Sequence, residues 1–127
     1  MKNPVLFGVV LALVTAGVVA PMPDEAALGV FGIVLGLAVG AYLGASASEP
    51  GVGAGVLEAG VGLGFLALAV AGVWLHPLFM AVAWVLHAGW DWLHHARKVP
   101  SRIVRWVPPF CAVYDLLVAA YMLWRWG

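Results

Sequence analysis

The stretch LFMAVAWVLHAGWDWLHHA, residues 78–96, is apolar enough and long enough to cross a lipid bilayer, yet it carries four ionisable side chains. These are His87, Asp91, His94 and His95. A spanning helix needs roughly 17 to 25 mostly apolar residues, and an aspartate at its centre costs about 2.5 to 3.5 kcal/mol on insertion scales. Such residues therefore face the interior of a helical bundle and indicate a functional site.

The rest of the chain has the same apolar character. Its 127 residues are 65% hydrophobic and 9% charged, whereas a soluble domain carries about 25% charged residues. Four more segments come near the length of a span: Pro4–Ala20, Ala26–Ala45, Gly53–Leu75 and Pro109–Trp124. The sequence predicts an all-α, polytopic membrane protein in which residues 1–127 form one domain, a compact bundle of five transmembrane helices.

The charges between these segments predict the orientation. Basic residues gather on one side of a five-span bundle: Lys2, Arg97, Lys98, Arg102 and Arg105. The other side receives only Arg125. By the positive-inside rule, the N-terminus and the 97–105 loop lie in the cytoplasm, as expected for a multi-pass protein of the cell inner membrane. We expect Arg97, Lys98, Arg102 and Arg105 to contact anionic lipid headgroups. Six basic and six acidic residues cancel, so nothing points to nucleic acid as a partner.

Glycines at every fourth position mark the second segment. They are Gly32, Gly36, Gly40 and Gly44. A glycine stripe of this spacing lets another helix approach closely. Two interpretations follow, namely packing inside the bundle and a contact between two copies of the chain in a homo-oligomer.

Histidines and carboxylates at helical spacing indicate a metal site. His87 and Asp91 are four residues apart, and Asp91 is followed by His94 and His95 at three and four residues. These four are the expected ligands of zinc, iron or manganese, with zinc or iron preferred. Helical bundles build such sites from inward side chains on facing helices.

Two carboxylates on neighbouring segments, Glu58 and Asp115, fall at about the depth of Asp91 and are the candidates for catalysis. Cys111 shares a helix face with Asp115 and is either a buried thiol or a further ligand.

The leading hypothesis is a metal-dependent membrane enzyme that acts on a lipid or another apolar substrate. The alternative is a non-catalytic membrane subunit or packing protein whose polar cluster is structural. Proton or ion passage and haem binding through His87 are further readings of the same residues. A continuous ion path is disfavoured, because the first two segments offer only Thr15 and Tyr42 as polar side chains within the membrane.

Two motifs carry a family resemblance. HAGWDWLHH (residues 87–95) and VPPFCAVYDLLVAAY (residues 107–121) resemble a small family of bacterial integral membrane proteins of unknown function, through the patterns HxxxDxxHH and PPxCxxxD. The resemblance covers about the last 40 residues and implies a helical fold but no reaction. A looser likeness to membrane fatty acid hydroxylases and desaturases rests on their HxxHH boxes around two irons. Those enzymes carry several such boxes, whereas this chain has four histidines in all, which argues against a di-iron oxygenase.

Overall fold

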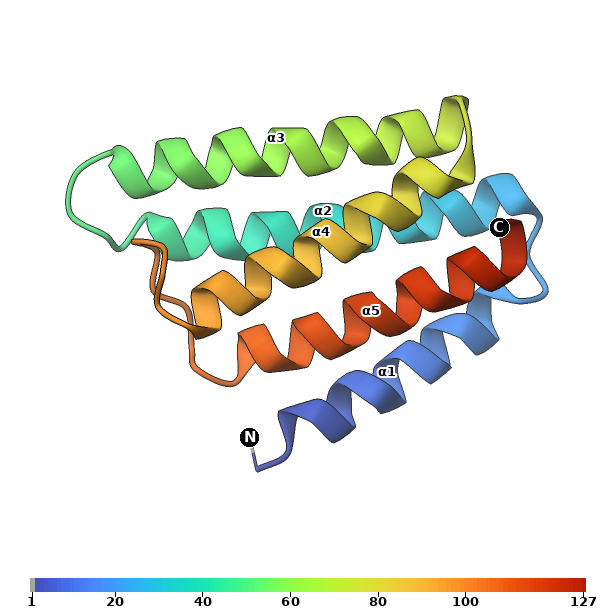
Figure 1. Cartoon of the computed structure of the whole chain (residues 1–127), viewed down its shortest axis with the longest axis horizontal. Helices are drawn as coiled ribbons and strands as arrows, with labels where there is room; N and C mark the ends of the chain where they lie inside the picture. The colour runs from blue at the N-terminus through green and yellow to red at the C-terminus, as the bar shows by residue number, and fades with distance from the viewer. Residues whose placement is uncertain (1) are drawn as a thin grey trace.

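The computed structural model describes residues 2–127, which form five helices joined by short connections (Figure 1). They are α1 (Pro4–Val19), α2 (Asp24–Ser46), α3 (Gly53–Trp74), α4 (Pro77–His95) and α5 (Val107–Trp126). The expected all-helical architecture is therefore confirmed, and each apolar segment of the sequence becomes one helix.

Local sequence signals explain where two of these helices begin. The side chain of Asn3 accepts a hydrogen bond of 2.9 Å from the backbone N–H of Leu6 at the start of α1. His76 does the same for α4, where its Nδ1 accepts from the N–H of Leu78 over 3.2 Å. A proline follows each cap, at a position where a missing N–H costs no helical hydrogen bond. His76 thus serves as an exposed helix cap.

Helix α4 occupies the centre of the bundle. It packs on α3 and α5 along its length, while α1 packs mainly on α5 and α2 mainly on α3. In Figure 1, α2 lies behind α4, which agrees with the additional contact between these two helices. The N-terminus, the 47–52 turn and the 96–106 loop share one end of the bundle, and the C-terminus lies at the other (Figure 1).

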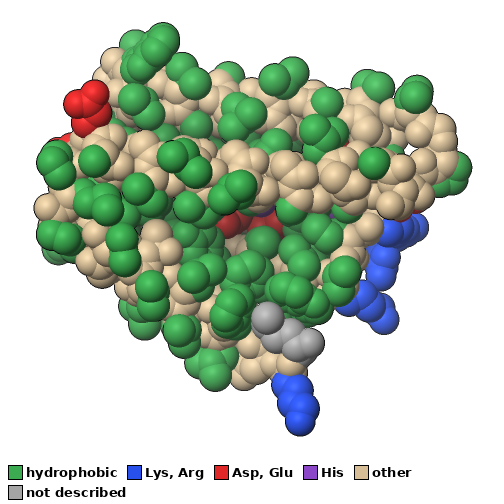
Figure 2. Space-filling model, turned by 180° about the vertical axis from the view of Figure 1, so that it is seen from behind, with side chains coloured by type: hydrophobic (Ala, Val, Ile, Leu, Met, Phe, Trp, Pro, Cys, Tyr) green, Lys and Arg blue, Asp and Glu red, His purple; other side chains and the backbone are tan. Residues whose placement is uncertain are grey.

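The outer surface suits a membrane. Helices α2, α3 and α5 are long and apolar enough to cross a bilayer. Large apolar side chains project outward from them, with Ile33 and Leu37 of α2 each more than two-thirds exposed. Figure 2 shows hydrophobic side chains over most of one face, with Lys and Arg gathered toward one end and acidic atoms at the other. This distribution is that of a membrane protein, because an aqueous surface rarely carries so large a continuous apolar area.

The glycine stripe of α2 has two different surroundings. A Cβ at Gly32 would meet Met80 of α4 at 3.6 Å, and one at Gly36 would meet Leu66 of α3 at 3.9 Å. Gly40 and Gly44 face open space. The first half of the stripe thus lies against the bundle, and the expected homo-oligomer contact stays a prediction for the second half.

Candidate metal centre

The inward face of α4 carries three of the four predicted ligands. His87 and Asp91 are fully buried and His94 is 4% exposed, because residues three or four apart return to the same helix face. His95 is exposed. It is the last residue of α4, where the neighbouring helices no longer cover the chain. The structure therefore does not bring His95 to the other three.

Depth separates the remaining residues into two groups. Seven residues of helix place His87 and His94 about 10.5 Å apart along the axis of α4. Asp115 of α5 joins His87, whereas Glu58 of α3 joins His94. The single polar site expected from the sequence is thus two neighbouring clusters.

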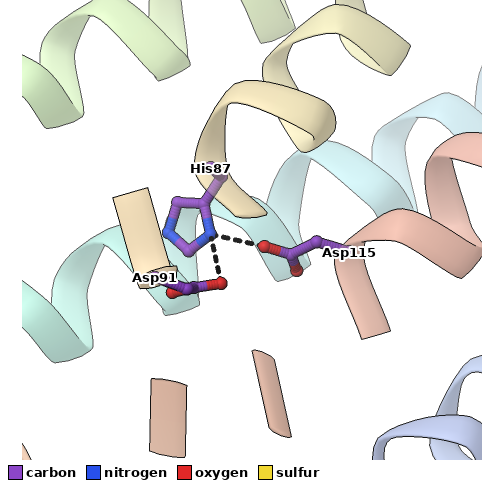
Figure 3. Close-up of side chains that lie close together, drawn as sticks. All are labelled: His87, Asp91 and Asp115. Carbon is purple, nitrogen blue, oxygen red and sulfur yellow. Dashed lines mark hydrogen bonds and ion pairs between the residues drawn. The ribbon is translucent and has the colours of Figure 1, made fainter. Parts of the chain in front are cut away.

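The His87 cluster consists of His87, Asp91, Asp115 and Tyr42. His87 Nδ1 lies 2.7 Å from Asp115 Oδ2 and 3.5 Å from Asp91 Oδ2, so one ring nitrogen faces two carboxylates (Figure 3). The Tyr42 hydroxyl donates a hydrogen bond of 2.6 Å to the other oxygen, Asp91 Oδ1. Three helices, α2, α4 and α5, meet at this cluster, and none of its side chains is more than 1% exposed.

Two polar atoms of this cluster have no hydrogen-bond partner among the residues described. They are His87 Nε2 and Asp91 Oδ2. In Figure 3 the second nitrogen of His87 lies on the side of the ring away from Asp115. The ring of Phe65 packs edge-on against His87, with its centroid 5.2 Å from that of the imidazole. Buried polar atoms are normally paired, so unpaired ones call for an explanation.

The His87 cluster also lacks positive charge. One imidazolium can balance one carboxylate, but here two buried carboxylates share a single imidazole. An isolated buried charge is very costly, so a further positive charge must enter as a proton or as a cation. A divalent cation with a neutral His87 balances both carboxylates at once.

The donor set fits a divalent metal. Each of the three residues His87, Asp91 and Asp115 offers a ligand atom, and these atoms lie within 4.8 Å of one another. Metal–ligand bonds of about 2.0–2.1 Å place neighbouring tetrahedral ligands about 3.3 Å apart. The distance of 3.5 Å between His87 Nδ1 and Asp91 Oδ2 is already close to this value. The distance of 2.7 Å between His87 Nδ1 and Asp115 Oδ2 would have to increase by about 0.6 Å to reach it. Tyr42 holds one oxygen of Asp91 and leaves the other free, as outer partners of metal ligands commonly do.

The Glu58 cluster consists of Glu58, Trp90, His94 and Ser101. Glu58 accepts hydrogen bonds from the Trp90 indole at 3.0 Å and the Ser101 hydroxyl at 2.5 Å. Its third contact is His94 Nε2 at 2.8 Å. These three contacts tie α3 to α4 and to the 96–106 loop.

The Glu58 cluster is electrically neutral without a metal. His94 Nδ1 lies 2.9 Å from the Trp90 carbonyl, which only accepts, so this nitrogen carries a proton. The contact between His94 Nε2 and Glu58 then holds one more proton, as an imidazolium beside a carboxylate or as a carboxylic acid beside an imidazole. Either form is neutral overall. His94 has no nitrogen free for a metal, and Glu58 has no oxygen free of hydrogen bonds.

The aromatic ring of Tyr42 separates the two clusters. Its centroid lies 4.2 Å from that of His94 and 5.8 Å from that of His87. Sequence reasoning missed Tyr42, Trp90 and Ser101 as members of these clusters. The one available signal was the hydroxyl of Tyr42 inside an otherwise aliphatic, glycine-rich segment.

The remaining predicted residues lie outside both clusters. Cys111 is a free, partly exposed thiol and does not belong to the three-residue ligand group. The basic residues expected at lipid headgroups are all exposed and lie in the 96–106 loop: Arg97, Lys98, Arg102 and Arg105.

The chain belongs to DUF6010, a family of unknown function, whose model matches residues 3–126. The expected membership of a family without a known activity is confirmed, and the match extends over nearly the whole chain. Neither a curated protein nor a solved structure shows a significant match.

Proposed function

We propose, since the family carries no assigned activity, that this protein binds a divalent metal ion inside the membrane through His87, Asp91 and Asp115. The observation that carries the proposal is the pairing of two fully buried carboxylates with one imidazole. Zinc and iron are the preferred ions, since both accept imidazole and carboxylate ligands. Asp115, a catalytic candidate in the sequence, serves as a ligand in this proposal.

The proposed setting is a multi-pass protein of the cell inner membrane, with five transmembrane helices and a cytoplasmic N-terminus. Helix α1 has 16 residues and α4 has 19, so they extend roughly 24 and 28 Å, close to the hydrocarbon thickness of about 30 Å. The polar residues of α4 are compatible with spanning because neighbouring helices shield them from lipid. Basic residues at the end that holds Lys2 and the 96–106 loop support the orientation.

Within this proposal, the metal serves an enzyme that acts on a lipid or another apolar substrate. Catalytic zinc sites keep three protein ligands and one open position, and the His87 cluster offers three. Figure 2 shows acidic atoms at the bottom of a hollow between helices in the middle of the apolar face. The buried acidic residues of the bundle are Glu58, Asp91 and Asp115, each at most 3% exposed. A bound metal would supply Lewis acidity there.

The test is metal analysis of the detergent-purified full chain. We expect about one zinc or iron per chain in the wild type. Asp91→Asn and Asp115→Asn keep the side-chain shape but remove the charge, and each should lower the metal content at least tenfold. His95→Gln is the matched control, because His95 is on the same helix but exposed, and it should retain the metal. Wild-type protein that binds neither Zn²⁺ nor Fe²⁺ when supplied would refute the proposal.

The second candidate is a non-catalytic membrane subunit whose polar cluster locks its helices together. The absence of free space beside the His87 cluster favours this candidate. The adjoining space between α2, α3 and α4, lined by Val39, Phe65 and His87 among others, has no room for a water molecule. In a purely structural cluster, Asp91→Asn would alter thermal stability equally with and without a chelator. In a metal protein, chelation would lower the stability of the wild type and leave the variant unchanged.

A further inference from the structure

A cavity lies at the basic end of the bundle, outside the His87 cluster. It has a volume of about 100 Å³ and is lined by His94, His95, Arg97, Ile103, Arg105 and Pro108. A water molecule occupies about 30 Å³ of liquid, so the cavity accepts a group of a few heavy atoms. It is formed by the end of α4, the 96–106 loop and the first turn of α5.

The charge in this cavity is positive and uncompensated. Arg97 and Arg105 line it, and none of its lining residues is acidic. Among residues 2–127, neither guanidinium lies within ion-pair distance of a carboxylate. Arg125, at the opposite end, does pair with Asp24 at 2.8 Å. Two unpaired guanidinium groups around a small cavity are suited to a phosphate, which accepts several charge-assisted hydrogen bonds.

The backbone at Arg97 is strained in a way that positions this residue at the cavity. Arg97 has φ 57°, a left-handed conformation that most helices reserve for glycine at this position. The N–H of Lys98 bonds to the carbonyl of Leu93 and that of Arg97 to the carbonyl of His94, which defines a Schellman motif. A residue kept in a sparsely populated conformation often serves a function that the preferred residue would not. Glycine would adopt this conformation without strain, yet the sequence has an arginine at this position.

The loop that covers the cavity is held in place from two sides. Ser101 donates to Glu58, and the backbone N–H of Arg102 donates to Glu49 over 2.8 Å. These contacts fix the backbone of the loop between the two arginines, so less of the chain has to be ordered when an anion binds.

We infer that this cavity binds the phosphate group of an anionic lipid headgroup. Trp92, three residues before His95 on α4, and Val104, between two lining residues of the loop, are both 61% exposed and suit the bilayer interface, where a headgroup phosphate lies. Free phosphate offers the same chemistry and is distinguished by the experiment below. The inference depends on the membrane location proposed above, but not on the metal.

The test measures binding of phosphatidylglycerol, phosphatidylcholine and inorganic phosphate to the detergent-purified full chain by native mass spectrometry. We expect the wild type to prefer phosphatidylglycerol. Arg97→Gln and Arg105→Gln should each weaken that binding about tenfold, the equivalent of one charge-assisted hydrogen bond. Arg102→Gln is the matched control, because Arg102 is exposed in the same loop but does not line the cavity. It should bind like the wild type.

Arg97→Gly separates binding from folding. Glycine relieves the left-handed strain, so its Tm should rise by a few degrees while phosphatidylglycerol binding falls as in Arg97→Gln. Equal losses of phosphatidylglycerol binding in Arg97→Gln, Arg105→Gln and Arg102→Gln would overturn the inference. Binding would then depend on the total positive charge of the loop and not on the cavity. Binding of inorganic phosphate that needs Arg97 and Arg105, without lipid binding, would support a phosphate cavity and overturn the lipid as its source.

Discussion

Tyr42 of α2 holds Asp91 of α4 through one hydrogen bond of 2.6 Å, from its hydroxyl to Oδ1. This bond occupies one oxygen of the carboxylate and leaves Oδ2 toward His87. We predict that Tyr42→Phe lowers metal affinity about 10- to 100-fold, as is typical when a ligand loses its outer partner. Isothermal titration with Zn²⁺ measures this.

Tyr114→Phe is the matched control for that variant. Tyr114 is also a buried tyrosine with a hydroxyl partner, Thr15 at 3.1 Å, but it lies outside the His87 cluster. It should lose about 1 kcal/mol of stability and keep the metal affinity of the wild type. Equal affinities in Tyr42→Phe and wild type would contradict the role of Tyr42.

Glu58→Gln should destabilise the protein without removing the metal. The amide nitrogen of glutamine only donates, so one of the three present contacts of Glu58 is lost or reversed. We expect a loss of about 1 to 3 kcal/mol in free energy of unfolding. Chemical denaturation measures the stability, and metal analysis of the same sample should give the wild-type content. A variant that loses its metal but keeps its stability would place Glu58 in the metal site instead.

Gly72→Ala should destabilise the packing of α3 on α4. A Cβ at Gly72 would lie 2.6 Å from Met80 Cβ and 2.8 Å from its backbone nitrogen, so the helices must move apart. We expect a loss of about 1 to 3 kcal/mol, as for overpacking elsewhere. Gly64→Ala is the control on the same helix, since nothing lies within 4 Å of its added methyl. Its thermal unfolding should match or exceed that of the wild type.

The proposed five-span topology places two acidic residues, Glu49 and Glu25, on opposite sides of the membrane. In a Cys111→Ala background, a cysteine at Glu49 should react with impermeant thiol reagents from the cytoplasmic side. A cysteine at Glu25, near the other end of α2, should react from the outside. Labelling of both positions from one side would rule out α2 as a spanning helix.

The open half of the glycine stripe allows a test of the homo-oligomer. A Cβ added at Gly40 or Gly44 has nothing within 4 Å, so we expect the bundle of a single chain to accept Gly44→Leu. If two copies meet through α2, Gly44→Leu shifts the oligomer to monomer in analytical ultracentrifugation. The same mass for wild type and variant would exclude this interface.

The helices could be predicted from the sequence because each is a continuous apolar run between prolines, glycines or charges. The meeting of His87, Asp91 and Asp115 follows in part from the same pattern, since ionisable side chains in such runs must face inward. Burial of His94 could also be anticipated from its spacing to Asp91.

The division into two clusters could not be predicted, because the rotation of α3 and α5 about their axes leaves no periodic signal in glycine-rich or aliphatic segments. The contact of Ser101 with Glu58 depends on the path of a loop, which has no periodicity. The exposure of His95 could not be predicted either, because it lies four residues from Asp91 and helical spacing alone places it on the buried face.

The pairing of α1 with α5 bears on how the chain assembles during synthesis. Gly8 of α1 lies so close to α5 that a Cβ there would be 2.6 Å from the Phe110 carbonyl, and Arg125 donates to the carbonyl of Val19 at the end of α1. Helix α1 therefore has its main partner in α5, and α2, α3 and α4 are synthesised between the two. The packing of α1 is therefore completed only after α5 has been synthesised.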